Sequence, residues 1–541
     1  MDKKTILAIV LSLILVMGYQ YFFMKPVPEE KSVSQTEENV VAFPQGENDK
    51  GALVERPMTA DAKKSLVKEE DSSVESRDIH VNTPLYHAVF STRGGTLKSF
   101  KLQDYKKNLE EGSEHIELVV LRGNMEYPLT VTFPDSNLDI PSDSLYEPNR
   151  ESLDLTGVGR EGTIVFSWSY PGEIRVEKIY TFYPDTYAFA LEVRVINLSD
   201  TTLHQNALLA WNEYVDPDAD TDRYSHEGPV GFEKGDFKSE KAKKLDEPKL
   251  FGPDVLWGGF ESKYFIASMI SQQPSLTNLI MSKNESNVVS VALQGPKNII
   301  PPHQTGIYRY DLYLGPKNYD YLKAQGVGLE NSINFGSWIK WLALPLLKAL
   351  NFVEQYVHNY GVAIIIITIL IKIIFWPLGT ISYRSMKGMQ QLQPQMLKIR
   401  EKYKDDKAKI QQETMALYRT HKVNPMSGCL PMLIQIPVFF GLYRALLYSI
   451  ELRHSPFFFW IQDLSAKDPY YVTPIIMGAT MFLQQKMSPT PGGNEMQAKI
   501  MMWMPIIFTF LFLNFPSGLV IYWLFNNILS IGQQYYINKR K

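Results

Sequence analysis

A single lysine, Lys372, lies inside a strongly apolar stretch, and its charge is the chain's first candidate for chemistry. Residues 360–376 read YGVAIIIITILIKIIFW, and Pro377 follows them. An ammonium group at the centre of a membrane helix costs roughly 2.5–3.5 kcal/mol on insertion scales. Two explanations remain open. Lys372 has a function, or it extends its ammonium group to the lipid headgroups from about 7–8 Å inside the expected helix end.

Other polar residues recur in the apolar runs of the C-terminal part. Thr368 lies four residues before Lys372, so the two share a helix face. Gln435 lies in a second run, and Asn526 and Asn527 lie in the last one. Each residue alone is explained by hydrogen bonding between helices. Because polar groups in membranes face a bundle interior or a wet cavity, the set predicts a hydrated pocket open to one side.

The N-terminal residues predict a membrane anchor. Two lysines precede an apolar run over residues 6–23 that ends in aromatic side chains. Aromatic residues favour the membrane interface, so we expect an uncleaved anchor over 1–24 with its N-terminus in the cytoplasm. A cleaved signal peptide is the alternative. Residues 25–78 are polar and acidic and predict a periplasmic linker.

Residues 79–325 predict one large all-β domain. Residues 175–182 and 187–195 alternate apolar and polar side chains around the turn at 183–186, and Leu85–Ser91 and Thr96–Leu102 flank Arg93-Gly94-Gly95. Many such runs predict a β-sandwich beyond the first anchor, on the far side of the membrane. It could bind a carbohydrate or a peptide, or serve only as a scaffold for docking.

The last part of the chain predicts a helical membrane bundle. Residues 331–350 predict an interfacial amphipathic helix, with a short core helix of the sandwich as the alternative. Five spans follow, at 357–377, 430–450, 470–486, 500–514 and 519–537. With the anchor, this gives six spans and places both termini in the cytoplasm. Positive residues agree, because 378–423 holds ten Lys or Arg against four acidic residues.

The basic segment 378–423 predicts a cytoplasmic helical hairpin. Met386, Met389, Leu392 and Met396 recur every three or four residues. This apolar stripe is either the seam between the two arms or a methionine-rich surface for varied substrates. Its basic residues either set the topology or also meet phosphates.

Composition excludes several classes of protein. The net charge of −3 argues against a general nucleic-acid binder, although a local basic patch remains possible. One cysteine, Cys429, permits no intrachain disulfide and no multi-cysteine metal cage. The sequence has no HExxH, GxSxG or Walker A motif. We therefore expect no enzyme, no cofactor and no metal.

Three long segments carry a specific resemblance. They are KVNPMSGCLPMLIQIPVFFGLYRAL (422–446), FFFWIQDLSAKDPYYVTPIIMGATMFLQQKMSP (457–489) and FPSGLVIYW (515–523). The whole chain resembles the YidC membrane protein insertases of Gram-negative bacteria, relatives of the organellar oxidase-assembly and chloroplast Albino insertases. The resemblance implies an inner-membrane protein with a periplasmic β-supersandwich, an interfacial helix, and a five-helix core whose groove opens to the cytoplasm and the lipid. Lys372 stands where this family typically has an arginine. The lysine keeps the positive charge but lacks the planar guanidinium fork of arginine.

The resemblance implies an insertase and chaperone for membrane proteins. Lys372, Thr368, Gln435 and Asn526 would line the substrate groove. The apolar contact candidates are Phe439, Met504, Phe508 and Tyr522, for which ordinary helix packing is an equal explanation. Expected partners are nascent membrane proteins, the lipid bilayer, the Sec translocon, and the ribosome with its signal-recognition machinery. The alternatives are a transporter or channel, and a membrane-anchored carbohydrate-active protein.

Overall fold

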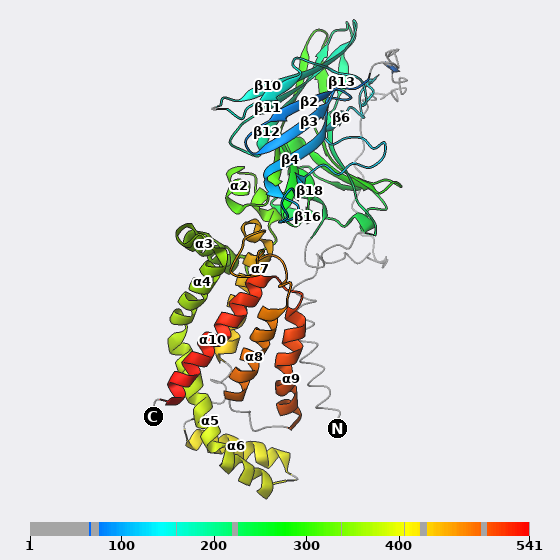
Figure 1. Cartoon of the computed structure of the whole chain (residues 1–541). Helices are drawn as coiled ribbons and strands as arrows, with labels where there is room; N and C mark the ends of the chain where they lie inside the picture. The colour runs from blue at the N-terminus through cyan, green and yellow to red at the C-terminus, as the bar shows by residue number, and fades with distance from the viewer. Residues whose placement is uncertain are drawn as a thin grey trace, which may run out of the picture. The chain divides into compact units, whose positions relative to one another are not determined.

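The computed structural model describes residues 64–65, 75–157, 159–218, 226–336, 338–404, 406–421, 423, 430–487 and 495–539. The expected anchor, 1–24, lies outside these residues, as does nearly all of the linker. The described chain consists of a β-rich part followed by a helical part (Figure 1).

The β-rich part is built from three large sheets. A nine-stranded sheet has the order β16-β15-β18-β19-β23-β12-β11-β10-β8, and two five-stranded sheets have the orders β17-β20-β21-β14-β6 and β5-β4-β3-β2-β9. The pairs β13-β22 and β1-β7 form two small sheets. The strands are β1 (Lys64–Ser65), β2 (Asp78–Asn82), β3 (Tyr86–Ser91), β4 (Thr96–Lys106), β5 (His115–Glu117), β6 (Thr130–Thr132), β7 (Leu138–Asp139), β8 (Glu147–Pro148), β9 (Ser152–Asp154), β10 (Gly162–Tyr170), β11 (Ile174–Phe182), β12 (Ala188–Asn197), β13 (Leu203–Gln205), β14 (Leu208–Tyr214), β15 (Gly228–Glu233), β16 (Asp236–Ser239), β17 (Lys249–Phe251), β18 (Val255–Glu261), β19 (Phe265–Ser271), β20 (Asn278–Lys283), β21 (Val288–Gln294), β22 (Asn298–Ile300) and β23 (Thr305–Pro316).

The two predicted hairpins are confirmed. β11 and β12 pair antiparallel, and burial alternates along both strands as the period-two pattern requires. β3 and β4 also pair antiparallel, with Ser91 opposite Thr96. Gly94 and Gly95 form the turn between them with φ of 68° and 57°, a left-handed conformation that glycine adopts without strain.

Aromatic side chains fill the space between the five-stranded sheet β5-β4-β3-β2-β9 and the nine-stranded sheet. Phe90 of β3 lies 4.7 Å from the ring of Tyr180 and 5.7 Å from that of Phe182, both on β11. Phe100 of β4 stacks 6.1 Å from Phe189 of β12. All five rings are buried. Burying each such side chain contributes about 1.5–3 kcal/mol, so this layer is a principal source of the domain's stability.

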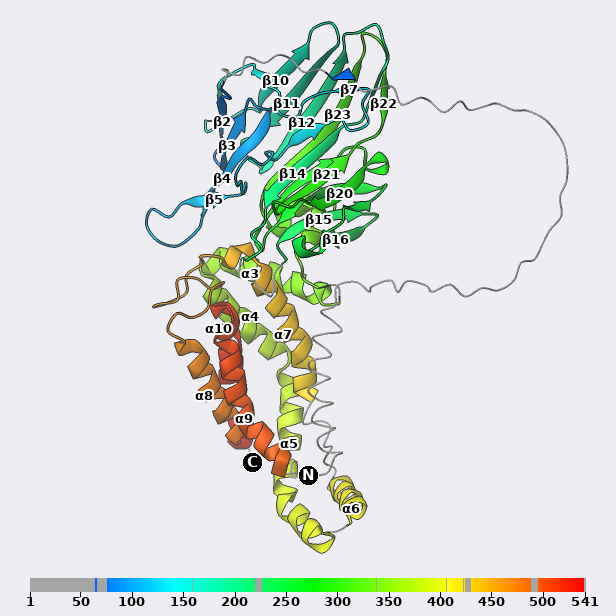
Figure 2. The ribbon, with the colours of Figure 1, turned by 90° about the vertical axis from the view of Figure 1, so that its right-hand side faces the viewer.

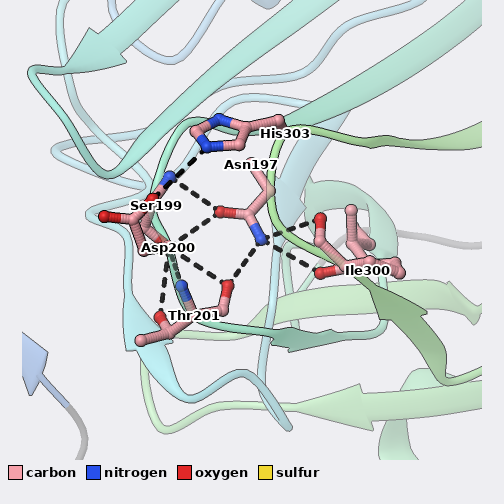
Figure 3. Close-up of polar contacts among 7 residues, drawn as sticks. Asn197, Ser199, Asp200, Thr201, Ile300 and His303 are labelled. Atoms are coloured by element: carbon pink, nitrogen blue, oxygen red, sulfur yellow. Dashed lines mark hydrogen bonds and ion pairs between the residues drawn. The ribbon is translucent and has the colours of Figure 1, made fainter.

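A polar cluster closes the far end of β12 (Figure 3). Asn197 is fully buried, and its side-chain amide donates to the backbone oxygens of Thr201 and Ile300 at 2.7 and 3.0 Å. Its side-chain oxygen accepts from the hydroxyl of Ser199 at 2.8 Å. These bonds join the end of β12 to the following loop and to the last residue of β22. Because the polar groups of the Asn197 side chain find their partners within this cluster, we regard the cluster as structural.

The helical part contains longer helices than the sequence suggested at several ends. The helices are α2 (Tyr319–Ala324), α3 (Lys340–Val357), α4 (Tyr360–Ile374), α5 (Trp376–Lys402), α6 (Lys407–Thr420), α7 (Leu430–Tyr448), α8 (Val472–Met487), α9 (Glu495–Phe512) and α10 (Ser517–Lys539). Short 3₁₀ turns occur at Ala242–Lys244, Pro274–Leu276, Leu329–Ser332 and Ile450–Leu452. α10 packs against α4 and α8, and α9 packs against α8 (Figures 1 and 2).

The helix expected over 331–350 is displaced along the chain. Gly336 adopts a left-handed φ of 81°, and the helix α3 begins only at Lys340. It continues to Val357 and ends at His358, whose φ is also left-handed at 50°. Asn359 then caps α4 by accepting a hydrogen bond from the amide of Val362 at 3.0 Å. The first residue of the expected second span, Val357, therefore belongs to the preceding helix.

Pro377 does not end the second apolar helix in the way the sequence suggested. α4 ends at Ile374, and α5 begins one residue after Phe375 with Pro377 in its first turn. Proline is tolerated there because the first amides of a helix have no intrahelical acceptor. The axes of α4 and α5 differ by 65°. The first arm of the expected hairpin is thus part of α5, which begins directly after the break at Phe375.

Helix length and hydropathy single out the bent pair α4–α5. Together these two helices are long and apolar enough to cross a membrane, although no single helix in the described residues is. Residues Met502–Phe512 of α9 form a shorter apolar stretch.

Candidate functional site: a lysine held by neutral partners

Lys372 of α4 contacts two polar side chains of α10. Its ammonium nitrogen donates to the side-chain oxygen of Asn526 at 3.3 Å and to the hydroxyl of Ser530 at 2.6 Å. Ser530 in turn donates to the backbone oxygen of Asn526 at 2.7 Å. Within the described residues, no carboxylate forms an ion pair with Lys372. Its charge is therefore oriented by hydrogen bonds but not neutralised.

The helices α4 and α10 run parallel and close together. A Cβ atom on Gly518 would lie 3.3 Å from Ile364, which is two turns before Lys372. Gly518 is likewise two turns before Asn526. Thr368 and Tyr522 therefore occupy the same level, one turn before the lysine. The hydroxyl of Thr368 is buried and donates to the backbone oxygen of Ile364 at 2.6 Å, so its bond lies within its own helix.

Gln435 of α7 reaches the same face of α10. Its side-chain amide donates to the hydroxyl of Tyr522 at 2.7 Å, and Tyr522 is buried. Tyr522 precedes Asn526 by four residues, a rise of about 6 Å along the helix. The predicted residues Lys372, Gln435 and Asn526 thus gather around two successive turns of α10, with Ser530 and Tyr522 as the residues that join them.

Further polar residues of α10 bind its other neighbours. The amide of Asn527 donates to the hydroxyl of Thr480 on α8 at 3.4 Å. The amide of Gln533 donates to the backbone oxygen of Trp376 at 3.0 Å, directly after the break between α4 and α5. The polar stripe at 526, 530 and 533 has helical spacing, a signal in the sequence that could have identified Ser530.

Two of the four apolar contact candidates, Phe439 and Phe508, pack against Trp523. The ring of Phe439 on α7 lies 4.7 Å from Trp523, and that of Phe508 on α9 lies 5.9 Å from it. Phe439 also stacks 6.4 Å from Tyr522. Met504 is half-buried one turn before Phe508. This aromatic cluster connects α7, α9 and α10 beside the polar turns, and Trp523 at its centre was missed because aromatic residues are common in apolar helices.

Large apolar side chains are exposed on the outer faces of three helices. Contiguous apolar surface of this kind marks contact with a membrane or a partner. The exposed residues are Ile369, Leu370, Ile373 and Ile374 on α4, Ile475, Ile476, Phe482 and Leu483 on α8, and Met502, Trp503, Ile506, Ile507, Phe510 and Leu511 on α9.

The β-rich part also contains buried titratable side chains, and their surroundings differ from those of Lys372. Burial lowers the pKa of Lys178 to about 7, and its ammonium nitrogen lies 2.6 Å from the backbone oxygen of Gly94. Burial raises the pKa of Glu213 to about 8, although Trp211 donates a hydrogen bond to it. No cluster of three or more His, Cys, Asp or Glu suited to a metal occurs among the residues the structure describes.

Comparisons with known proteins cover both parts of the chain. The family model described as "YidC periplasmic domain" matches residues 78–349, and that described as "60Kd inner membrane protein" matches residues 352–541. A membrane protein insertase YidC from Syntrophus aciditrophicus is 59% identical over 100% of both chains. A second, from Geobacter metallireducens, is 41% identical over 100% of this chain and 98% of its own.

A solved chain described as an active YidC insertase with its first transmembrane domain resolved is 22% identical. The match covers 86% of this chain and 93% of that chain, with a TM-score of 0.37. The full-length identities and the two family models determine the assignment: the chain belongs to the YidC family of membrane protein insertases.

Proposed function

We propose that this chain inserts integral membrane proteins into the bacterial inner membrane and assists their folding. Its full-length relatives are named for insertion, and none of the functions weighed from the sequence explains the helical part better. The observation that supports a role for the site is the pairing of Lys372 with Asn526 and Ser530, two neutral side chains. A cation held in this way can attract a passing acidic group without first breaking an ion pair.

The physical task is to move a polar segment across hydrocarbon. Each unsatisfied polar group costs several kcal/mol in a lipid environment, so a wet groove in the cytoplasmic half of the membrane shortens the costly path. Lys372, Gln435, Asn526 and Ser530 supply donors and acceptors for water and for the substrate. Thr368 contributes less, because its hydroxyl already bonds to its own helix. These residues remain proposed groove residues.

The apolar segment of a substrate leaves toward lipid beside α7 and α9. Phe439, Phe508 and Trp523 offer it an aromatic surface before it reaches the bilayer, with Met504 and Tyr522 at the edges of that surface. The driving force is the burial of apolar surface in lipid, about 25 cal/mol for each Å² removed from water. No bond is made or broken in this process, so the proposed function is not enzymatic.

The proposed topology has six spans, with both termini and the α5–α6 hairpin in the cytoplasm. The excess of basic residues in 378–423 supports this orientation. The arms of the hairpin contact each other where the hydroxyl of Tyr418 lies 3.1 Å from the sulfur of Met396, while Leu397 and Met415 are exposed. We propose that this hairpin receives nascent chains from the ribosome and its targeting machinery, and that the insertase also works beside the Sec translocon.

The groove is tested by measuring insertion of a substrate series that differs only in the charge of a short outer tail. The chain is reconstituted in proteoliposomes with Lys372 intact, with Lys372→Ala, or with the matched control Lys486→Ala on α8. Lys372→Ala should impair acidic-tailed substrates most and neutral ones least, while the control should insert all of them normally. Equal insertion by all three proteins across the series would leave Lys372 with a topological role only.

The hairpin is tested separately by deleting residues 384–420. Insertion should fall, while the remaining helices keep the melting behaviour of the intact protein. Normal insertion by a stably expressed deletion variant would exclude a receiving role for the hairpin.

A further inference from the structure

An open pocket of about 660 Å³ lies along α5, beside the last turns of α10. It lies beyond the break between α4 and α5, apart from the contacts of Lys372. Its lining residues are Trp376, Thr380, Arg384, Lys387, Gly388 and Gln391 of α5, with Tyr536 and Ile537 of α10. The α5 members recur every three or four residues, so they form one face of that helix. The pocket is thus a surface that α5 shares with the end of α10.

The charged residues that line the pocket in the described part of the chain are both positive. They are Arg384 and Lys387, and no Asp or Glu occurs among these described lining residues. The ammonium nitrogen of Lys387 donates to the backbone oxygen of Asn538 at 3.2 Å, which fixes its position at the wall. The ammonium group of Lys387 also adds positive charge to the pocket wall. Arg384 is exposed and offers the planar fork that matches phosphate oxygens.

The residues at the upper end of the pocket change from apolar to aromatic to cationic. Ile373 and Ile374, just before the helix break, are 60% and 71% exposed. Next come the rings of Trp376 and Tyr536, whose centroids lie 6.3 Å apart and which are both partly exposed. Arg384 follows about 12 Å further along α5. A lipid leaflet has its acyl chains, its interface and its headgroups in the same order.

We propose that this pocket binds the phosphate headgroup of an anionic phospholipid, such as a phosphatidylglycerol, in the cytoplasmic leaflet. Arg384 and Lys387 contact the phosphate, while Trp376 and Tyr536 lie where the headgroup meets the acyl chains. Free phosphate shares the anionic chemistry, but it makes no use of the exposed isoleucines or the aromatic pair. The lipid is therefore the source that the whole surface favours. The inference depends on membrane embedding but not on the role of Lys372.

The test uses the full chain in nanodiscs in which brominated phosphatidylglycerol is titrated into phosphatidylcholine. Bromine quenches nearby tryptophan, and the difference between wild type and Trp376→Phe isolates the signal of Trp376. Quenching of that signal should saturate at a low fraction of the anionic lipid. Brominated phosphatidylcholine should quench it only in proportion to its amount. Equal quenching by the two lipids in wild type would overturn the proposal.

Charge variants separate a pocket from general attraction to a charged membrane. The variant Arg384→Gln/Lys387→Gln should weaken the preference about fivefold per cation, or about 25-fold for the pair, the usual strength of cations near an anionic surface. The matched control Lys398→Gln/Lys402→Gln removes the same charge from α5 outside the pocket, and it should retain the wild-type preference. An equal loss in both variants would contradict a specific site.

Two further arms identify the ligand and exclude misfolding. Inorganic phosphate at concentrations far above that of the lipid should not displace the brominated lipid, and displacement would assign the pocket to a soluble anion instead. The charge-keeping variant Arg384→Lys/Lys387→Arg should retain most of the preference. Loss in this variant as well, with unchanged thermal unfolding, would show that positive charge does not determine binding.

Discussion

Lys178 and Lys372 each donate hydrogen bonds to another element of the chain, but the groups that accept these bonds differ. Lys178 in the β-rich part donates to the backbone oxygen of Gly94 at 2.6 Å and lies 5.6 Å from the ring of Tyr146. Lys372 in the helical part donates to the side chains of Asn526 and Ser530. Backbone oxygens in a tight turn cannot move away, whereas side chains can rotate.

The environment of each lysine follows from the element that carries it. Lys178 is 1% exposed in an aromatic core, where the carbonyl it binds belongs to the turn between β3 and β4. The bond therefore fastens one sheet to another. Lys372 is only half-buried, beside a run of polar residues along α10. Lys178 therefore has fixed backbone and ring partners that join two sheets, whereas Lys372, the proposed substrate contact, has side-chain partners that can rotate.

The largest effect is expected from reversing the charge of Lys372. Lys372→Glu should slow insertion of acidic-tailed substrates by more than about tenfold, which corresponds to a barrier higher by more than about 1.4 kcal/mol, because it repels the tail while keeping the site polar. Lys372→Arg should retain insertion. The measurement is the initial rate of insertion into proteoliposomes at equal insertase content. A Glu variant as fast as the Arg variant would remove the distinction between the two lysines.

The second expected effect is on stability and concerns Lys178. Its pKa of about 7 in the folded chain is below the ordinary 10.5, so folding disfavours its protonated form. This destabilisation is complete below pH 7 and disappears as pH rises to 10.5, at about 1.4 kcal/mol for each unit of the shift. Wild type should therefore gain stability between pH 7 and 10 relative to Lys178→Met.

Urea unfolding of the β-rich part, followed by tryptophan fluorescence, measures this difference between the two proteins at each pH. Insertion by Lys178→Met at neutral pH should equal that of wild type. A stability difference that stays constant from pH 7 to 10 would show that Lys178 is not held in an environment that disfavours its charge.

A smaller effect should follow from removing one partner of Lys372. Ser530→Ala leaves Asn526 in place, so the lysine keeps one hydrogen bond. We expect insertion of acidic-tailed substrates to change by no more than about threefold, since one hydrogen bond to a charged group contributes about 1.5–3 kcal/mol only when nothing replaces it, and water can replace it here. The same substrate series measures this. A loss as large as that of Lys372→Glu would mean that Ser530, rather than the charge, controls the site.

The smallest effect on insertion is expected from the β-rich part as a whole. Residues 79–320 should fold alone when expressed in soluble form, with a cooperative unfolding transition, because the aromatic core lies between their own sheets. Deleting most of these residues should leave insertion close to that of the full chain. A severe loss with an intact helical part would show that this domain has more than an accessory role.

The sequence predicted the β hairpins and the proximity of Lys372 and Asn526 because each depends on a local pattern. Alternation along β11 and β12 determines which side chains are buried, and polar residues in apolar helices must find one another. The ends of the helices were harder to predict from the sequence. The break at Phe375 depends on how Pro377 fits the first turn of a new helix, and a proline that ends a helix has the same sequence signal as one that begins the next.

The contribution of individual residues was also hard to predict. Thr368 and Lys372 share a helix face, yet the threonine hydroxyl bonds to the carbonyl of Ile364 in its own helix. A hydroxyl can choose this local acceptor wherever a helix provides one. An ammonium group on a long side chain reaches the neighbouring helix instead. Side-chain length therefore decides whether a shared face becomes a shared site.

The bond from Gln533 to the backbone oxygen of Trp376 has a mechanical consequence. The hairpin arm α5 leaves α4 at an angle of 65°, so a load on its tip acts as a torque about Phe375. A rotation of α5 that displaces the carbonyl of Trp376 would stretch this bond. Gln533 lies on the same helix as Asn526 and Ser530, less than one turn beyond Ser530. A force on the hairpin that displaces the start of α5 would therefore act on α10, the helix whose side chains bind Lys372.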